Sequence, residues 1–301
     1  MDSSSNKINI LIIGSNGRLG SFIVKHCLAK PNLITHILIR DRQKNQELVS
    51  QVENAGGKVF EGDIMKPETI KNITKGMHTV IMAVAFGIDI TLQGQMNVID
   101  DCEANGVKRI VPTEYSENFL EFTEEELKDM PVIKSKLHVE NCIKSLPIKL
   151  LQINSGIFLE CMFDFLFAKG FDYWGDANHR FQVTTYEDTG RFIAAAVADK
   201  EKEGRLSFVA NEVSAIEAAE IYNRVRGTNK EAKYKGSLQD LRNEAEELKK
   251  KGDPNAWIPD WFALVFDDRS KFKKIDNQDY PEIKVTTVEE LLKQRPDLVV
   301  L

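Results

Sequence analysis

Spaced glycines constrain this chain more than any other feature of its sequence. Gly14, Gly17 and Gly20 follow directly after the apolar run 8–13. The stretch 19–29 then has the periodicity of an amphipathic helix. A strand, a glycine turn and a helix in this order suit the pyrophosphate of a dinucleotide, because helix N-terminal N–H groups face the phosphates and no Cβ blocks them. We therefore expect a nucleotide site here rather than an empty turn.

Strand-like and helix-like segments alternate through the first half of the chain, which predicts a parallel sheet with helices on both faces. The expected strands are 8–13, 36–39, 58–61, 79–84 and 109–112, and the expected helices are 19–29, 46–55, 69–74 and 93–105. Later segments predict helices over 132–144, 189–199, 215–225 and 239–251, and a strand over 149–153. We expect an α/β fold of Rossmann type, with a nucleotide-binding domain over 1–155. A smaller substrate-binding α/β lobe over 156–301 is expected to be partly interleaved with it.

Composition narrows the classes of partner. The 301 residues are 42% hydrophobic and carry a net charge of -6, which argues against nucleic-acid binding. The N-terminus has no apolar signal-peptide region, and no apolar run is long enough to span a membrane. The four cysteines and five histidines show no ligand spacing, so we expect no metal. These features predict a cytoplasmic protein with reduced thiols.

The end of the second expected strand discriminates between cofactors. An NAD site usually places an acidic side chain there to bind the ribose hydroxyls. This chain instead has Arg40, Asp41 and Arg42. A guanidinium suits a 2′-phosphate, because its planar fork donates two hydrogen bonds to one anion. NADP(H) is therefore favoured over NAD(H), with Asp41 pointing away or pairing locally, and solvated loop charges are the alternative.

Two further strand ends point to the same cofactor. Asp63 follows the third expected strand, where it can accept a hydrogen bond from the adenine amino group or cap the next short helix. The small residues Ala83, Val84 and Ala85 follow the fourth strand. They would let the backbone pass close to the cofactor.

Several motifs together resemble the NmrA-like and isoflavone-reductase-like proteins, which are atypical members of the short-chain dehydrogenase/reductase superfamily. The similar segments are the glycine turn, 39–40, 61–63, 106–115, 280–281 and 286–290, and they span nearly the whole chain. The resemblance implies a Rossmann domain, NADP(H) and a small C-terminal domain that closes a substrate cleft. It does not imply one reaction.

The resemblance also suggests a catalytic lysine. The superfamily pair Tyr-x-x-x-Lys is incomplete, because Val132 occupies the tyrosine position relative to Lys136. The reductase branch uses a lone lysine on this helix. Counting back from Glu140 selects Lys136, whereas counting back from the Leu-Pro at 146–147 selects Lys134. We favour Lys136, which could bind the nicotinamide ribose and assist proton transfer, and the alternative is a solvated surface lysine.

Other residues are expected near the reacting atoms. Thr113 ends the fifth expected strand, at the sheet edge where ligands bind, and resembles the Ser/Thr that lines related active sites. Tyr115 is a candidate for the missing hydroxyl or a packing aromatic. Phe158 would stack on the nicotinamide or belong to the core. The expected cofactor contacts are Gly14, Asn16, Gly17, Arg18, Leu19, Gly20, Arg40, Arg42, Asp63, Ala83, Val84, Ala85, Lys136 and Phe158.

These patterns favour an NADPH-dependent reductase of a small, apolar substrate of carbonyl, enone or quinone type. The alternative is a redox sensor without catalytic activity, which binds NADP(H) and passes its state to a protein partner. The missing tyrosine favours the sensor. Lys136 and the aromatic segment 158–174 favour the reductase, because such a segment could form an apolar substrate wall.

Overall fold

The computed structural model describes residues 7–84 and 87–301, and it divides into two compact units. Unit 1 comprises Met1–Glu114, Pro131–Ile153 and Thr189–Leu206, and unit 2 comprises Tyr115–Met130, Asn154–Asp188 and Ser207–Leu301. The chain therefore passes between the units several times. The segment Tyr115–Met130 is inserted in the middle of unit 1 but packs with unit 2.

Unit 1 is built on a seven-stranded sheet with the order β10-β6-β5-β4-β1-β2-β3. Its strands are β1 (Ile8–Ile13), β2 (Leu33–Ile39), β3 (Val59–Glu61), β4 (Thr79–Met82), β5 (Arg109–Val111), β6 (Lys149–Asn154) and β10 (Gly204–Ser207). From β3 to β6 every neighbouring pair is parallel. The strand order reverses between β1 and β4, where ligands bind in doubly wound folds. The expected Rossmann-type α/β fold is confirmed.

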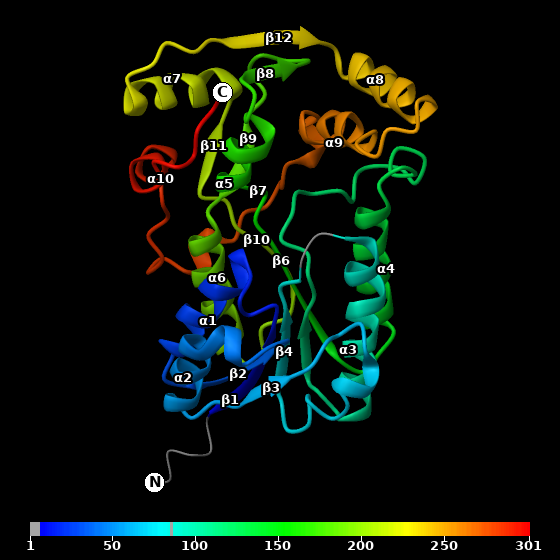
Figure 1. The fold of residues 1–301 in the computed structure, drawn as a ribbon, viewed down its shortest axis with the longest axis vertical. Coiled ribbons are helices and arrows are strands. Elements are labelled where there is room, and N and C mark those ends of the chain that lie inside the picture. The colour runs from blue at the N-terminus through cyan, green and yellow to red at the C-terminus, as the bar shows by residue number, and fades with distance from the viewer. Residues whose placement is uncertain (1–6, 85–86) are drawn as a thin grey trace. The chain divides into compact units, whose positions relative to one another are not determined.

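Helices cover both faces of this sheet, with α1 and α2 on one side and α3 and α4 on the other (Figure 1). The helices of unit 1 are α1 (Arg18–Leu28), α2 (Gln46–Asn54), α3 (Gln95–Ala104), α4 (Pro131–Lys144) and most of α6 (Tyr186–Ala198), whose first three residues belong to unit 2. Ile10, Leu11 and Ile12 in β1 are fully buried, because side chains on both faces of a parallel strand meet a helix layer.

A buried arginine joins the sheet to the end of α6. Arg109 in β5 is 0% exposed. Its guanidinium donates to the backbone oxygens of Val197, Asp199 and Lys202 at 2.5–2.9 Å. Carbonyl groups at a helix C-terminus lack partners inside the helix, so a cationic donor stabilises that end.

The expected helix over 69–74 is wrong. The structure has a 3-10 turn at Pro67–Thr69 followed by irregular turns. Asn72 has a φ of 63°, and the Asp101 carboxylate accepts hydrogen bonds from the backbone N–H groups of Asn72 and Thr74. This side chain on α3 therefore satisfies donors that a helix would have used internally. The expected helix over 93–105 begins as a π-helical turn, Ile90–Gly94, and becomes α3 only at Gln95.

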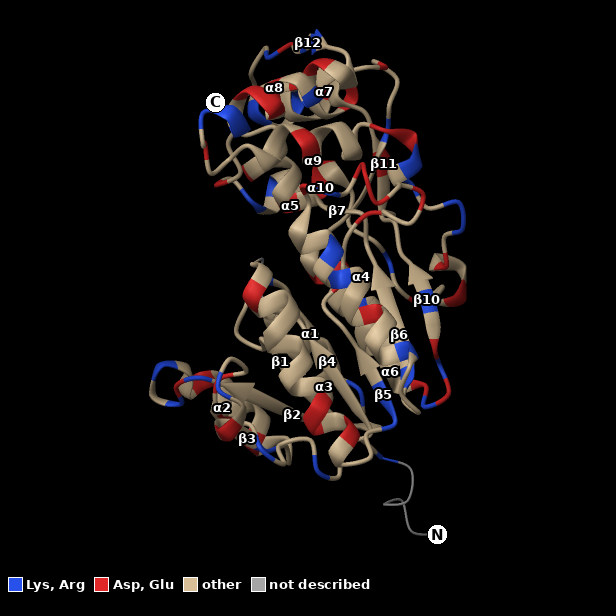
Figure 2. Ribbon diagram, turned by 90° about the vertical axis from the view of Figure 1, so that its right-hand side faces the viewer, with Lys and Arg blue, Asp and Glu red and all other residues tan. Residues whose placement is uncertain are grey.

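Unit 2 contains two small sheets, β11-β9-β7 and β12-β8, with helices around an aromatic-rich core. Its strands are β7 (Ile157–Phe158), β8 (Phe171–Trp174), β9 (Phe181–Thr184), β11 (Asn211–Val213) and β12 (Ala232–Gly236). Its helices are α5 (Leu159–Cys161), the π-helix Met162–Leu166, α7 (Ala215–Arg226), α8 (Leu238–Lys250), α9 (Trp257–Val265) and α10 (Val288–Gln294). Figure 2 shows basic and acidic residues together on α8. Across the described ranges, no helix is both long and apolar enough to cross a membrane.

Candidate functional site

The turn after β1 packs backbone directly against backbone. Gly14 has a φ of +80°, and a Cβ there would lie 2.2 Å from the carbonyl oxygen of Ala83. A Cβ on Gly20 would lie 1.9 Å from the carbonyl oxygen of Gly14. Both distances are far below van der Waals contact, so any side chain at these positions requires the backbone to move. The first and third glycines therefore fix the shape of the turn.

Gly17, the middle glycine, lies at the exposed start of α1. Gly17 is exposed and is the N-cap of α1, and its N–H donates to the carbonyl oxygen of Gly14 at 3.0 Å. Among the described residues, no side chain caps this helix. Asn16 and Arg18 are exposed beside it, whereas Leu19 is buried against the sheet. The turn thus presents the N-terminal end of α1, which carries partial positive charge, at an open surface that suits an anion.

The two arginines after β2 are held differently. Arg42 donates to a Glu53 carboxylate oxygen at 2.6 Å and to the carbonyl oxygen of Val59 at 3.1 Å. Arg40 is exposed, and among the described residues it has no hydrogen bond or ion pair. Asp41 accepts a hydrogen bond from the Lys44 backbone N–H, which lowers the pKa of its carboxyl group. Asp41 therefore pairs locally, and Arg40 remains available to a ligand.

The Asp63 carboxylate closes a local turn. One of its carboxylate oxygens accepts a hydrogen bond from the Met65 N–H at 3.0 Å, and its own N–H donates to the Thr69 hydroxyl at 2.9 Å. The Met65 hydrogen bond closes a local turn at Asp63. It does not cap the next short helix, Pro67–Thr69, whose N-cap is Lys66 and which has no side-chain cap. The Asp63 side chain is half-buried, and its other carboxylate oxygen is not part of this turn.

The end of β4 is tied to the end of β5. The Thr113 hydroxyl donates to the carbonyl oxygen of Met82 at 2.9 Å and accepts a hydrogen bond from the Val84 N–H at 3.1 Å. The Thr113 N–H donates to the side-chain oxygen of Gln95 at 2.8 Å. Thr113 therefore holds the backbone beside Ala83 in place. Ala85, the last of the expected small residues, lies outside the described residues.

Lys136 and Lys134 occupy different environments on α4. Lys136 is half-buried, and its Nζ donates to the carbonyl oxygen of Glu114 at 2.6 Å. Lys134 is exposed. Glu114 follows Thr113 directly after β5, so the Lys136 ammonium lies near the carboxyl edge of the sheet that also carries the glycine turn.

The other two candidates belong to unit 2. Tyr115 is buried and has a φ of 43°, a conformation that bulky residues rarely adopt. Phe158 is half-buried and packs on Tyr186, with ring centroids 4.2 Å apart. The Tyr186 hydroxyl lies 3.1 Å from the Cys161 sulfur. Phe158 is therefore part of a small aromatic cluster rather than of the fully buried core.

Within unit 1, direct contacts connect Gly14, Ala83, Val84 and Thr113. The Asn16 side chain also donates to the Asn45 side chain at 3.1 Å, which links the glycine turn to the loop after β2. The sequence interpretation missed Gln95 and Asn45. Gln95 could have been found from the sequence, because it is a polar residue on the helix face that buries Val98 and Cys102. Asn45 lies in a loop without any such pattern.

The sequence matches the NmrA-like family over residues 6–290. The chain belongs to the NmrA-like family. Among curated relatives, a phenylcoumaran benzylic ether reductase of Pyrus communis is 24% identical over 96% of this chain and 99% of its own length. Eugenol synthase 1 of Petunia hybrida is 24% identical over 95% of this chain and 98% of its own length. The resemblance inferred from the motifs is thus confirmed.

Solved structures share the fold over nearly the whole chain. Crystal structures of pinoresinol-lariciresinol and phenylcoumaran benzylic ether reductases superpose with a TM-score of 0.79 at 19% identity, covering 96% of this chain and 99% of theirs. The leucoanthocyanidin reductase–NADPH complex of Vitis vinifera superposes with a TM-score of 0.78 at 21% identity, covering 95% and 98%. This member of the NmrA-like family therefore has the reductase fold in both of its units.

Proposed function

We propose that this protein is an NADPH-dependent reductase of a small, apolar substrate of carbonyl, enone or quinone type. The observation that carries the proposal is the contact of Lys136 Nζ with the Glu114 carbonyl oxygen, at the sheet edge that also bears the glycine turn. The relatives support the general activity, since they are named as reductases and a eugenol synthase. The carbonyl, enone or quinone class is our own step beyond them.

The residues of unit 1 fit NADP(H). The uncapped N-terminus of α1 suits the pyrophosphate, with Gly17 leaving room for it. Arg40 suits the 2′-phosphate because no group in the described part of the chain holds its guanidinium, whereas Arg42 is already paired with Glu53. Asn16, Arg18 and Leu19 complete the turn, and Asp63 and Val84 stand at the neighbouring strand ends.

NADPH, when bound, supplies a hydride to the substrate. In our proposal Lys136 binds the nicotinamide ribose and donates a proton to the substrate oxygen or its bound water. Its ammonium is already oriented by the Glu114 carbonyl oxygen. Thr113 contributes by holding the backbone at Val84, because both functions of its hydroxyl are occupied. Phe158 and Tyr115 are further proposed site residues.

The test compares two lysines on one helix. Lys136→Ala should lower kcat by about 100-fold or more, the usual size of an acid–base contribution, with at most a modest change in NADPH affinity. Lys134→Ala is the matched control and should keep near-normal turnover, because Lys134 is exposed. Turnover is measured as NADPH oxidation at about 340 nm with quinones, enones and aryl aldehydes.

A loss of turnover confined to Lys134→Ala would reverse the assignment of the lysine. Wild-type protein that oxidises NADPH with no member of the panel would contradict the reductase. Different melting temperatures with NADP+ and NADPH, together with a protein partner retained only in one redox state, would then support the sensor.

A further inference from the structure

An acidic segment, defined here as Tyr115–Met130, is inserted between β5 and α4. It contains six acidic residues and one lysine, and it forms neither a helix nor a strand. It packs with unit 2, although the residues on both sides of it belong to unit 1. Something other than backbone hydrogen bonding in regular elements must therefore hold it.

Cations from the C-terminal part of unit 2 hold this segment at several points. Lys273 pairs with Glu121 at 2.7 Å, and Lys249 on α8 pairs with Asp129 at 2.5 Å. Arg269 pairs with Glu126 at 2.8 Å. The acidic residues are thus spaced so that separate basic side chains hold the segment at several points along its length.

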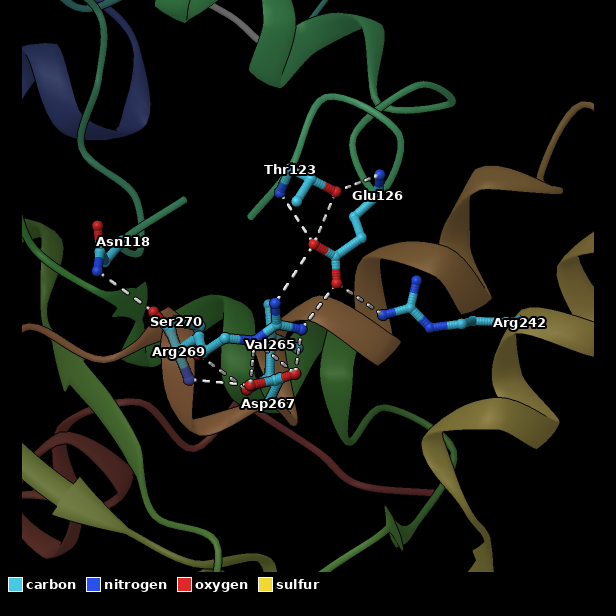
Figure 3. Close-up of polar contacts among 8 residues, drawn as sticks. All are labelled: Asn118, Thr123, Glu126, Arg242, Val265, Asp267, Arg269 and Ser270. Atoms are coloured by element: carbon cyan, nitrogen blue, oxygen red, sulfur yellow. Dashed lines mark hydrogen bonds and ion pairs between the residues drawn. The ribbon is translucent and has the colours of Figure 1, made fainter. Parts of the chain in front are cut away.

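Arg269 makes the most extensive of these contacts, and Figure 3 shows its guanidinium between Glu126 and Asp267. Its guanidinium donates to both carboxylate oxygens of Glu126 and to both of Asp267. Its Cζ also lies 4.4 Å from the ring centroid of Phe122. The hydrogen bonds from Arg269 lower the pKa of Glu126 to about 2. Bidentate pairing restricts both distance and angle, so Arg269 fixes an orientation as well as a position.

Backbone and apolar contacts support the same docking. The Asn118 N–H donates to the carbonyl oxygen of Ser270 at 2.9 Å, and its side chain donates to the carbonyl oxygen of Arg269 at 3.2 Å. Phe119 and Leu127 are buried. Burying these apolar side chains favours the folded segment, and the Arg269 guanidinium, in contact with Glu126 and Phe122 together, selects one register.

The Lys136–Glu114 contact joins the chain before the acidic segment to the helix after it. Glu114, whose carbonyl oxygen accepts from Lys136, precedes the segment by one residue, and α4, which carries Lys136, begins at Pro131 directly after it. We propose that Arg269 is a positioning residue: by fixing the acidic segment through Glu126, it sets the geometry of the Lys136–Glu114 contact. The catalytic consequence rests on the proposed function.

The kinetic test uses Arg269→Gln, Glu126→Gln and the conservative Arg269→Lys. Each glutamine variant should lower kcat about 10-fold or more, since small misplacements of a reacting group have effects of this size, while the affinity for NADPH stays unchanged. Arg269→Lys keeps the charge but not the fork and should recover only part of kcat. The control Arg224→Gln removes another ion pair of unit 2, that with Glu289, and should leave kcat unchanged.

A second readout needs no turnover. Lys136 in Arg269→Gln should react several-fold faster with an amine-labelling reagent than in wild type, measured by peptide mass spectrometry, because its contact with Glu114 is loosened. Lys134 serves as the internal control. The milder Glu126→Gln should show the same change if Arg269→Gln folds poorly.

Unchanged labelling of Lys136 in both variants would overturn the positioning role, whatever the reaction is. Equal loss of kcat in the Arg224 control would also overturn it, since the effect would then be general destabilisation of unit 2. Absence of wild-type turnover would count against the reductase alone, because the labelling result would still decide the role of Arg269.

Discussion

The glycine turn of unit 1 and the acidic segment of unit 2 each follow a strand of the large sheet, and they are held in different ways. In the turn, backbone atoms pack directly on backbone atoms, and the Gly14 carbonyl oxygen lies 1.9 Å from where a Cβ on Gly20 would be. In the segment, side chains do the holding, through pairs such as Arg269 with Glu126. The conformation of the turn requires residues without a Cβ, whereas the docking of the segment requires charged side chains.

This difference has energetic consequences. A close backbone approach tolerates no added atom, and its cost does not depend on salt or on carboxyl ionisation. Partly exposed ion pairs each contribute little, are screened by salt and vanish when the carboxylate is protonated. Single substitutions should therefore have large effects in the turn and small, condition-dependent effects on stability in the segment.

The largest effect is expected from adding one carbon to the turn. Gly20→Ala places a Cβ 1.9 Å from the Gly14 carbonyl oxygen, so the strand–turn–helix unit must shift. We expect a loss of unfolding free energy of about 3 kcal/mol or more, at the upper end of overpacking effects, together with loss of cofactor binding. Chemical denaturation and calorimetric titration with NADPH measure the two quantities.

Gly17→Val is the matched comparison in the same turn. A Cβ there lies 3.2 Å from the nearest atom, and the residue is exposed, so the fold should survive. The branched side chain would occupy the place proposed for the pyrophosphate, and binding of either cofactor should be lost. Normal circular dichroism with unchanged affinity would show that this turn is not the nucleotide site.

The same contrast explains how much could be predicted from the sequence. The alternation of apolar strands and helices predicted β1, α1, α2 and the parallel sheet, because burial in a layered fold imposes a local period. The expected helix at 69–74 failed because Asp101, far along the chain, caps its backbone groups. Hydrogen-bond partners from distant segments leave no local pattern.

The site follows the same rule. The glycine spacing pointed to the turn, since a turn of this kind needs its glycines at fixed positions. Arg40 and Arg42 were indistinguishable in the sequence, because only the tertiary structure places Glu53 beside Arg42. The acidic segment is rich in carboxylates but has no helical or strand periodicity. Its sequence therefore predicted neither its docking nor the role of Arg269.

An intermediate effect is expected from the two arginines after β2. Arg40→Ala should weaken NADPH binding by about 1.5–3 kcal/mol, the range for a hydrogen bond to a charged group, and leave NADH almost unaffected. Arg42→Ala should cost less NADPH affinity, because Glu53 already engages that guanidinium. Calorimetric titration of both variants with both cofactors gives the comparison. Equal affinity of wild type for NADPH and NADH would contradict the phosphate role.

The smallest effect concerns the pH dependence of the acidic segment. Arg269 lowers the pKa of Glu126 from an ordinary 4.5 to about 2 in the folded protein. The unfolded chain therefore binds a proton at higher pH than the folded one. The stabilisation from this carboxylate is complete above about pH 5 and is lost as the pH falls from there toward 2.

Because the pair is partly exposed, its contribution should be about 1 kcal/mol or less, below what the pKa shift alone would suggest. Glu126→Gln should lower the melting temperature slightly at neutral pH, and its difference from wild type should shrink as the pH approaches 3. The neighbouring Glu124→Gln is the control, since Glu124 has no ion pair among the described residues. A difference between Glu126→Gln and wild type that stays constant from pH 7 to about pH 3 would show that packing, and not charge, holds the segment, because only the charged form is removed by acid.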